Sequence, residues 1–215
     1  MTHSPPMTQG PATTTSPKAV KKGHNSLVEL VIIVAVALGL ALGIQAFLVK
    51  PFRIPSESMV PTLEVGQRVL VDRVSFRFGD PDRGDIVVFK PPAGADTSQC
   101  AVPHPDAPCP KETPERSDTN FIKRVVGLPG DHLKVLEGSV YINGKRQKEP
   151  FVRPSTDCGT CNLPREITIP DGHYYMMGAN RGESADSREW GPVPKKWIIG
   201  KAFMTYWPPN RIGLL

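Results

Sequence analysis

The stretch LVIIVAVALGLALGIQAFLV, residues 30–49, decides the layout of this chain. It contains no formally charged residue, and Gln45 is its only strongly polar side chain. At about 1.5 Å of rise per residue, a helix of this length matches the roughly 30 Å hydrocarbon core of a bilayer. The stretch therefore predicts one membrane-spanning helix, which we place at residues 27–49.

The segment before this stretch indicates which way the helix crosses. Residues 1–28 contain three lysines and no acidic residue, a bias that keeps an N-terminus in the cytoplasm. Residues 1–26 are rich in Pro, Ser and Thr, which predicts a disordered tail. A cleaved secretory leader has a similar outline, but the only nearby Ala-x-Ala triplet, at residues 35–37, lies inside the apolar run. We therefore favour an uncleaved anchor in the plasma membrane with residues 50–215 outside.

Charge and length limit what this outer part can be. The net charge of the chain is +5, of which +3 lies on the tail and +2 on the remainder. The basic balance therefore reflects membrane orientation. No Lys/Arg stripe alternates with aromatic residues, so we do not expect a nucleic-acid partner. The outer residues are enough for one sizeable domain, which we expect to be monomeric.

Short β-type runs separated by turn residues fill this domain. They lie at residues 68–74, 85–89, 121–126, 132–136, 139–142, 166–169, 174–177 and 197–206. Asn143-Gly144 follows one of them and favours a tight hairpin turn. Long helical periodicity is confined to the anchor. The pattern predicts a mainly β fold, an antiparallel sheet domain tethered by one N-terminal transmembrane helix.

A Pro-rich stretch at residues 91–118 interrupts this rhythm and predicts an inserted, loop-rich subdomain. It carries Cys100 and Cys109, and a second local pair follows at Cys158 and Cys161. Two disulfides, one zinc site or free thiols are all compatible with these spacings. We favour disulfides because an oxidising compartment preserves them.

Two residues suggest a catalytic pair. Ser58 lies between Pro55 and Pro61, which restrict the backbone around it. A serine hydroxyl needs a neighbouring base, and the five histidines lack a companion pattern. Lys123 interrupts the apolar run 121–126, so on a strand it shares a face with Phe121. Apolar surroundings lower the pKa of an amine and leave it neutral. Taken alone, the run around Ser58 also fits a simple turn, and Lys123 also fits an exposed strand-edge lysine.

Resemblance decides between these alternatives. The segment IPSESMVPTL, residues 54–63, is similar to the nucleophile motif of bacterial type I signal peptidases. Four further segments resemble the later motifs of that family in the same order: residues 66–74, 83–89, 121–131 and 178–188. The chain is thus identified as a member of this Ser/Lys dyad family.

The resemblance implies a role for each matching side chain. Ser58 is the expected nucleophile and Lys123 the general base. The expected supporting residues are Ser56 as oxyanion-hole donor, Ser184 as the hydroxyl that orients the lysine, and Asp186 with Arg188 as a structural ion pair. The chain departs at Ala179, where the family commonly has an acid, and this puts a supporting polar link in doubt.

A mechanism follows from these roles. Neutral Lys123 accepts the Ser58 proton, Ser58 forms an acyl-enzyme and water hydrolyses it. We expect substrates to be exported precursors with small residues before the cut, and Ile54 and Met59 to contribute to the pocket walls. We expect the lipid bilayer as the other partner, and no metal or cofactor.

Two other functions remain open from the sequence. One is a self-cleaving repressor type of Ser/Lys peptidase, although those proteins are soluble and carry a DNA-binding domain. The other is a membrane-tethered β domain that binds a partner and has no enzymatic activity.

Overall fold

The computed structural model describes residues 26–153, 155 and 158–215. The predicted disordered tail at residues 1–26 falls almost entirely outside the described residues. The chain divides into two compact units between Leu40 and Ala41, and each is described by itself.

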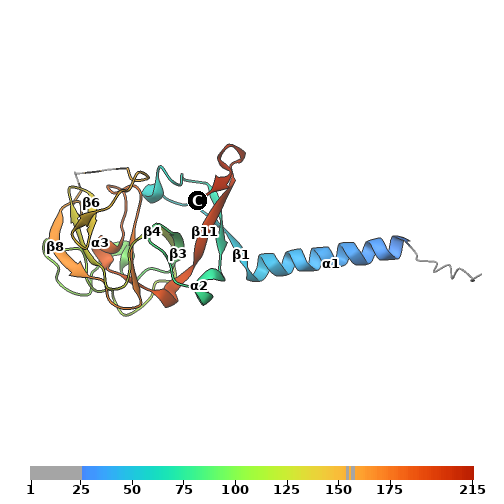
Figure 1. Cartoon of the computed structure of the whole chain (residues 1–215), viewed down its shortest axis with the longest axis horizontal. Coiled ribbons are helices and arrows are strands. Elements are labelled where there is room, and N and C mark those ends of the chain that lie inside the picture. Colours follow the sequence, from blue (N-terminus) through green and yellow to red (C-terminus); the bar gives the residue numbers. More distant parts are fainter. Residues whose placement is uncertain (1–25, 154, 156–157) are drawn as a thin grey trace, which may run out of the picture. The chain divides into compact units, whose positions relative to one another are not determined.

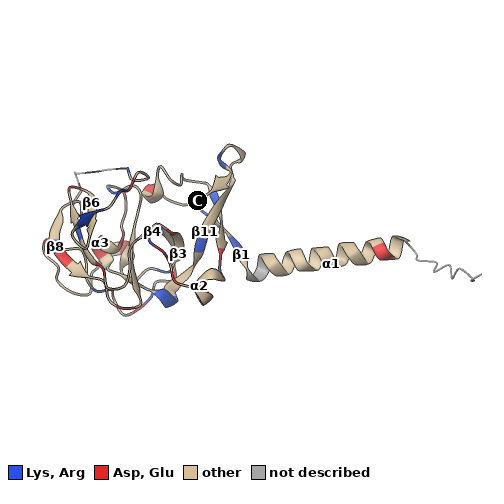
Figure 2. Cartoon of the chain, in the orientation of Figure 1, with Lys and Arg blue, Asp and Glu red and all other residues tan. Residues whose placement is uncertain are grey.

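The N-terminal helix is α1, Ser26–Phe47. It is long and apolar enough to cross a membrane, and its one acidic residue, Glu29, lies in the first turn. Figure 2 shows the helix tan over most of its length. The predicted transmembrane segment, residues 27–49, extends two residues beyond the end of this helix. The helix stops at Phe47 because Val49 begins strand β1, Val49–Arg53, which pairs with the next strand of the domain.

Residues 41–215 contain two antiparallel sheets (Figure 1). The larger has the order β1-β2-β11-β3-β4-β9-β10, with β12 paired to β11, and the smaller has the order β7-β6-β5-β8. The strands are β1 Val49–Arg53, β2 Arg68–Asp72, β3 Ile86–Phe89, β4 Phe121–Gly127, β5 His132–Leu136, β6 Ser139–Ile142, β7 Lys145–Arg146, β8 Leu163–Thr168, β9 His173–Met177, β10 Val193–Pro194, β11 Ile198–Trp207 and β12 Gly213–Leu214. The predicted antiparallel, mainly β fold is confirmed.

Helices outside α1 are single turns, as the missing helical periodicity indicated. They are η1 Glu57–Met59, α2 Ser75–Phe78, η2 Ala95–Thr97, α3 Ser187–Trp190, η3 Lys195–Trp197 and η4 Pro209–Arg211. The run predicted at residues 68–74 is too long. Its strand ends at Asp72, whose carboxylate accepts the N–H groups of Val74 and Ser75 and so turns the chain into α2.

The hairpin predicted at Asn143-Gly144 is present between β6 and β7. Asn143 has φ 50° and Gly144 has φ 76°, the left-handed values that a tight hairpin turn requires. Three apolar clusters fill the domain. The one that supports the site contains Ile54, Met59, Leu63 and Ile122, together with side chains from β2, β3 and β11.

Candidate active site

Ser58 lies in η1, a single turn held against the loop after β9. The backbone N–H of Asn180 donates to the Ser58 carbonyl at 3.0 Å, and the Asn180 side chain donates to the Glu57 carbonyl at 3.3 Å. Met59, next in the turn, is fully buried. Contacts with the core and with Asn180 thus hold the serine in place. Asn180 was not among the residues predicted for the site.

Lys123 reaches this serine from β4, a central strand of the larger sheet. Its Nζ donates to Ser58 Oγ at 2.5 Å, across 65 positions of sequence. Only 4% of Lys123 and 5% of Ser58 is exposed to solvent. Burial lowers the pKa of Lys123 to about 8, because a charged ammonium loses its hydration in the interior. The two residues predicted as a catalytic pair are therefore in contact.

On β4, Lys123 lies on the same face as Phe121, as the sequence predicted. Lys123 Nζ lies 5.7 Å from the centroid of the Phe121 ring, as the alternation of side chains along a strand requires. β4 is paired with β3 on one side and β9 on the other. β4 is therefore a central strand and Lys123 is buried, which rules out the exposed strand-edge position.

Ser56 lies on the solvent side of the pair. Its hydroxyl is 3.3 Å from Ser58 Oγ, close enough for a hydrogen bond in either direction, and the residue itself is exposed. A hydroxyl in this position can turn toward a group that approaches Ser58 from solvent.

Ser184 is buried beside the pair. Its Oγ has no hydrogen-bond partner among the described residues, so the bond to the lysine amine that the resemblance implies is not formed here. Gly178 lies between Ser184 and the nucleophile, and a Cβ there would overlap both Ser184 Oγ and the Ser58 carbonyl oxygen. The close approach of Ser184 to the Ser58 backbone therefore depends on glycine.

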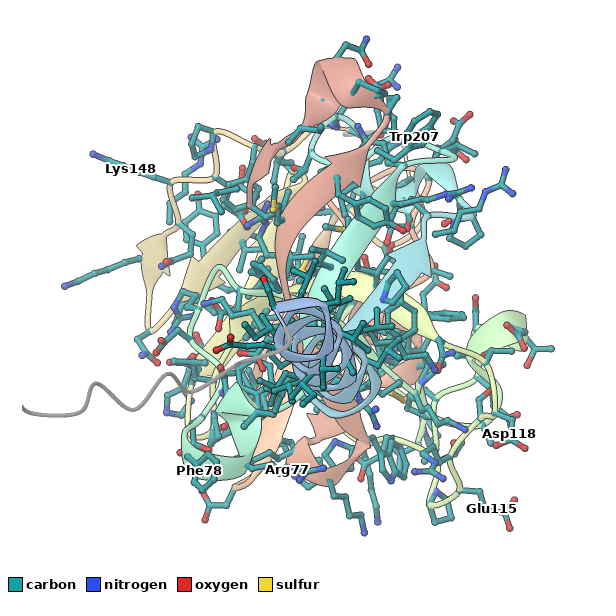
Figure 3. All side chains as sticks on the ribbon, turned by 90° about the vertical axis from the view of Figure 1, so that its right-hand side faces the viewer. Arg77, Phe78, Glu115, Asp118, Lys148 and Trp207 are labelled. Atoms are coloured by element: carbon teal, nitrogen blue, oxygen red, sulfur yellow. A yellow bond between two sulfur atoms is a disulfide. The ribbon has the colours of Figure 1, made fainter. Side chains whose placement is uncertain are left out.

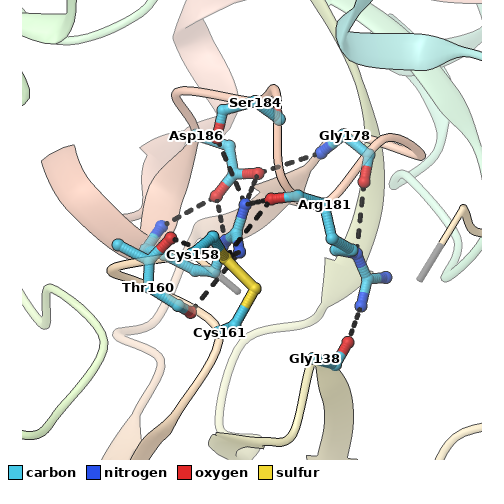
Figure 4. Close-up of a disulfide and its surroundings, with 9 residues drawn as sticks. Gly138, Cys158, Thr160, Cys161, Gly178, Arg181, Ser184 and Asp186 are labelled. Atoms are coloured by element: carbon cyan, nitrogen blue, oxygen red, sulfur yellow. Dashed lines mark hydrogen bonds and ion pairs between the residues drawn. A yellow bond between two sulfur atoms is a disulfide. The ribbon is translucent and has the colours of Figure 1, made fainter. Parts of the chain in front are cut away.

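Asp186 and Arg188 form the expected ion pair. Asp186 Oδ1 lies 2.8 Å from Arg188 Nε, and both residues are completely buried. Burial acts to raise the pKa of Asp186, but the charge and hydrogen bonds of Arg188 lower it overall, so the carboxyl stays ionised. Asp186 also accepts the backbone N–H of Gly178 at 3.1 Å (Figure 4).

This pair also controls the electrostatics at the lysine. After burial, the largest influences on the pKa of Lys123 are Asp186, which raises it, and Arg188, which lowers it. Because the effects of the two charges on the pKa of Lys123 oppose each other, burial remains the main cause of its lowered pKa. The ion pair thus supports the loop without forcing the amine to keep its proton.

Ala179, the position that departs from the family pattern, is 1% exposed. The neighbouring Arg181 takes its acid from elsewhere, since its guanidinium lies 2.6 Å from Glu149 Oε1. The same group donates to the carbonyls of Gly178 and Gly138 (Figure 4). Sequence reasoning missed Glu149, which lies 32 positions away from Arg181 with no motif to connect them.

The four cysteines form two disulfides, Cys100–Cys109 and Cys158–Cys161, which confirms the favoured interpretation. Cys100 and Cys109 cluster with His104, but their sulfurs are bonded to each other. Both bridges reach Arg188. The N–H of Cys109 donates to the Arg188 carbonyl at 3.0 Å, and the guanidinium of Arg188 contacts the Thr160 carbonyl at 3.4 Å (Figure 4).

Comparison with known proteins agrees with this geometry. Residues 27–207 match the model of the family described as signal peptidase, peptidase S26. This chain belongs to the S26 signal peptidase family. Membership makes it a serine endopeptidase that removes signal peptides, so the enzyme class and function expected from the sequence are confirmed.

Relatives within the family are similar over most of the chain. A protein of Synechocystis sp. named "Probable signal peptidase I-2" is 37% identical, over 97% of this chain and 86% of its own length. Signal peptidase I of Leptolyngbya laminosa is 37% identical over 90% of this chain and 86% of its own. A crystal structure of a signal peptidase I from Enterococcus faecalis aligns with 57% of this chain and 97% of its own, with a TM-score of 0.37 and 22% identity.

Proposed function

We propose that Ser58 is the nucleophile of this signal peptidase and that Lys123, in its neutral form, is the general base. The observation that carries the proposal is the 2.5 Å contact between Lys123 Nζ and Ser58 Oγ in a buried setting. A lysine with a pKa of about 8 is about one-tenth neutral at pH 7 and half neutral at pH 8, and only the neutral amine can accept a proton.

The reaction then proceeds through an acyl-enzyme. Lys123 takes the hydroxyl proton of Ser58 while Oγ attacks the scissile carbonyl, and the oxyanion that forms accepts hydrogen bonds from the Ser58 N–H and the Ser56 hydroxyl. The protonated lysine then gives its proton to the leaving amine. Water, deprotonated by the same lysine, releases the acyl group. Ser184 Oγ is buried without a partner among the described residues, so it would orient the amine only by moving toward Lys123 when substrate binds.

Substrate binding is assigned to a groove of about 330 Å³ beside η1, lined by Ile54, Pro55, Phe121 and Ile122 among others. Its walls are mixed, since Arg53, Thr119 and Asn120 line it beside the apolar residues, and the expected preference for Ala and similar side chains before the cut rests on the family resemblance. Ile54 supplies part of the wall. Met59 is completely buried and acts from beneath, by supporting the turn that carries Ser58.

Placement in the cell follows from α1. An apolar N-terminal helix in a signal peptidase indicates membrane anchoring. We infer that the membrane is the plasma membrane and that the N-terminus is cytoplasmic, since the lysines precede the helix. The catalytic domain then meets precursors where their cut site emerges outside.

The test is cleavage of a precursor by the purified full-length protein. Ser58→Ala and Lys123→Met should each lower kcat by at least about 10³-fold, while the exposed control Lys145→Gln should cleave normally. A chelator should leave the rate unchanged. Normal cleavage by either dyad variant would refute the assignment, and loss of activity with chelator would indicate a metal-dependent reaction.

A further inference from the structure

A second groove, which contains neither Ser58 nor Lys123, is lined by positively charged side chains. It has a volume of about 550 Å³ and is formed by Arg73, Arg77, Lys195 and Lys196, with Phe76, Ile198 and Ile199 as its apolar side. The residues come from α2 and the segment before it, and from η3 and the start of β11. The volume lies within the range of small-molecule sites.

The positive charge of this groove is largely unneutralised. Lys195 pairs with Asp80 at 2.7 Å, but Asp80 is itself mostly exposed. Among the described residues, Arg73, Arg77 and Lys196 take part in no ion pair. Three free cations beside apolar side chains match a ligand with an anionic head and a hydrocarbon body.

Chain connectivity places this groove next to the membrane anchor. The backbone N–H of Arg73 donates to the carbonyl of Leu48 at 2.9 Å, and Leu48 directly follows the last residue of α1. The β1–β2 pairing continues from that point with Val49 opposite Asp72. In a membrane-anchored protein, Arg73 is therefore held where the apolar span ends, which is the level of the lipid headgroups.

Beside the groove an apolar side chain is left open to solvent. Phe78, next to Arg77 in α2, is 88% exposed, and Figure 3 labels the two residues at the same edge of the domain. A Phe–Arg pair of this kind suits the boundary between acyl chains and headgroups, where an aromatic ring enters the lipid and a guanidinium contacts phosphate.

We propose that this basic groove binds the phosphate headgroup of an anionic phospholipid in the leaflet that faces the catalytic domain. Arg73, Arg77 and Lys196 contact the phosphate, and Phe76, Ile198 and Ile199 contact the glycerol and the upper acyl chains. The inference rests on the membrane anchoring proposed above. Lipid binding in this groove fixes the orientation of the catalytic domain on the bilayer, close to where precursors emerge.

The test is binding of short-chain lipid to full-length protein in neutral detergent, measured by titration calorimetry. Dihexanoyl phosphatidylglycerol should bind saturably, more tightly than dihexanoyl phosphatidylcholine or inorganic phosphate. Arg73→Gln/Arg77→Gln/Lys196→Gln should weaken that binding at least about tenfold. The matched control Lys145→Gln/Lys148→Gln/Arg165→Gln, which removes three exposed charges elsewhere, should bind as the wild type does.

A charge reversal guards against misfolding of the triple variant. Arg77 and Lys196 are exposed, so Arg77→Glu/Lys196→Glu should fold normally and bind phosphatidylglycerol at least as weakly. Unchanged binding in this variant, or equal binding of phosphatidylcholine, would overturn the proposal. Equally tight binding of inorganic phosphate would overturn it in favour of a free-anion site.

Cleavage of a soluble signal-peptide substrate in the same detergent separates this proposal from the proposed function. The basic-groove variants should keep that activity within about twofold, since none of their residues touches the dyad. The lipid titration needs no catalysis, so a failure of the dyad assignment would leave its result intact.

Discussion

At the scale of single residues, the proposed mechanism depends on the protonation state of the Lys123 amine. Its pKa of about 8 predicts that kcat/KM rises with pH, reaches half its maximum near pH 8 and levels off by about pH 9, because the amine is half neutral at its pKa and about nine-tenths neutral one unit above it. Initial rates on a peptide substrate between pH 6 and 10 would check this. A rate that keeps rising to pH 10 would mean that the amine is solvated.

The buried lysine also lowers stability. The folded pKa lies below the unfolded value of 10.5, so the unfolded state binds more protons between pH 8 and 10.5, and the free energy of unfolding rises with pH across that window. Lys123→Met removes this penalty. We expect it to raise the free energy of unfolding at pH 7 by up to about 3 kcal/mol, measured by urea denaturation, while abolishing cleavage. A destabilised Lys123→Met protein would contradict the account.

Gly178 is the second residue on which the site depends. Gly178→Ala introduces a Cβ into the space between Ser184 Oγ and the Ser58 carbonyl, which displaces the nucleophile. A shift of about 1 Å costs on the order of 10²-fold in rate, so kcat should fall by that amount. Gly213→Ala is the control, since nothing lies within 4 Å of a Cβ there. Equal activity of both variants would show that the segment around Ser58 can shift to accommodate the added methyl group without loss of function.

At the scale of elements, the loop after β9 is held by buried charges that the sequence indicated only in part. Glu149→Ala leaves the Arg181 guanidinium, 1% exposed in its side chain, without its acid. Loss of one partner of a buried pair typically costs about 3–5 kcal/mol, and we expect a decrease of that order in the free energy of unfolding. Glu183→Ala, at an exposed position of the same loop, should change it by less than about 0.5 kcal/mol. Thermal melts of the two variants would separate them.

Local patterns and long-range contacts differ in what they reveal before a structure is known. Alternation around residues 121–126 predicted β4, and Asn143-Gly144 predicted the tight turn after β6, because both features are set by neighbouring residues. The strands β1, β7, β10 and β12 went unrecognised. Three of them have only two residues, and β1 contains Pro51, which disfavours a strand. The pairing of Arg181 with Glu149 depends on folding and leaves no local pattern.

The same distinction holds within the site. Motif resemblance assigned Ser58, Lys123, Asp186 and Arg188 to one site, and the structure places the first two in direct contact. Asn180 and Gly178 lie within the last matched segment, yet their roles follow from backbone contacts with Ser58. A sequence motif names the reacting groups, whereas the residues that position them become visible only through the fold.

At the scale of the whole molecule, the proposed orientation puts the N-terminus in the cytoplasm and the catalytic domain on the other side of the membrane. In spheroplasts, protease added from outside should degrade the domain of residues 50–215, while an epitope tag before residue 1 should stay protected until the cells are lysed. Substitution of the three tail lysines by Gln weakens the orientation signal and should make a fraction of the tags accessible to the protease in intact spheroplasts. Immunoblotting before and after lysis measures both results. Tags that are digested in intact spheroplasts of the wild type would reverse the proposed orientation.

The most direct measurement is an NMR titration of the Lys123 side chain in full-length protein labelled with ¹³C at the lysine Cε, with the signal assigned from its absence in Lys123→Met. The proposed mechanism predicts a midpoint near pH 8, well below the ordinary lysine value of 10.5. A midpoint near 10.5, the ordinary value for lysine, would mean that the amine is charged at neutral pH and cannot serve Ser58 as a base.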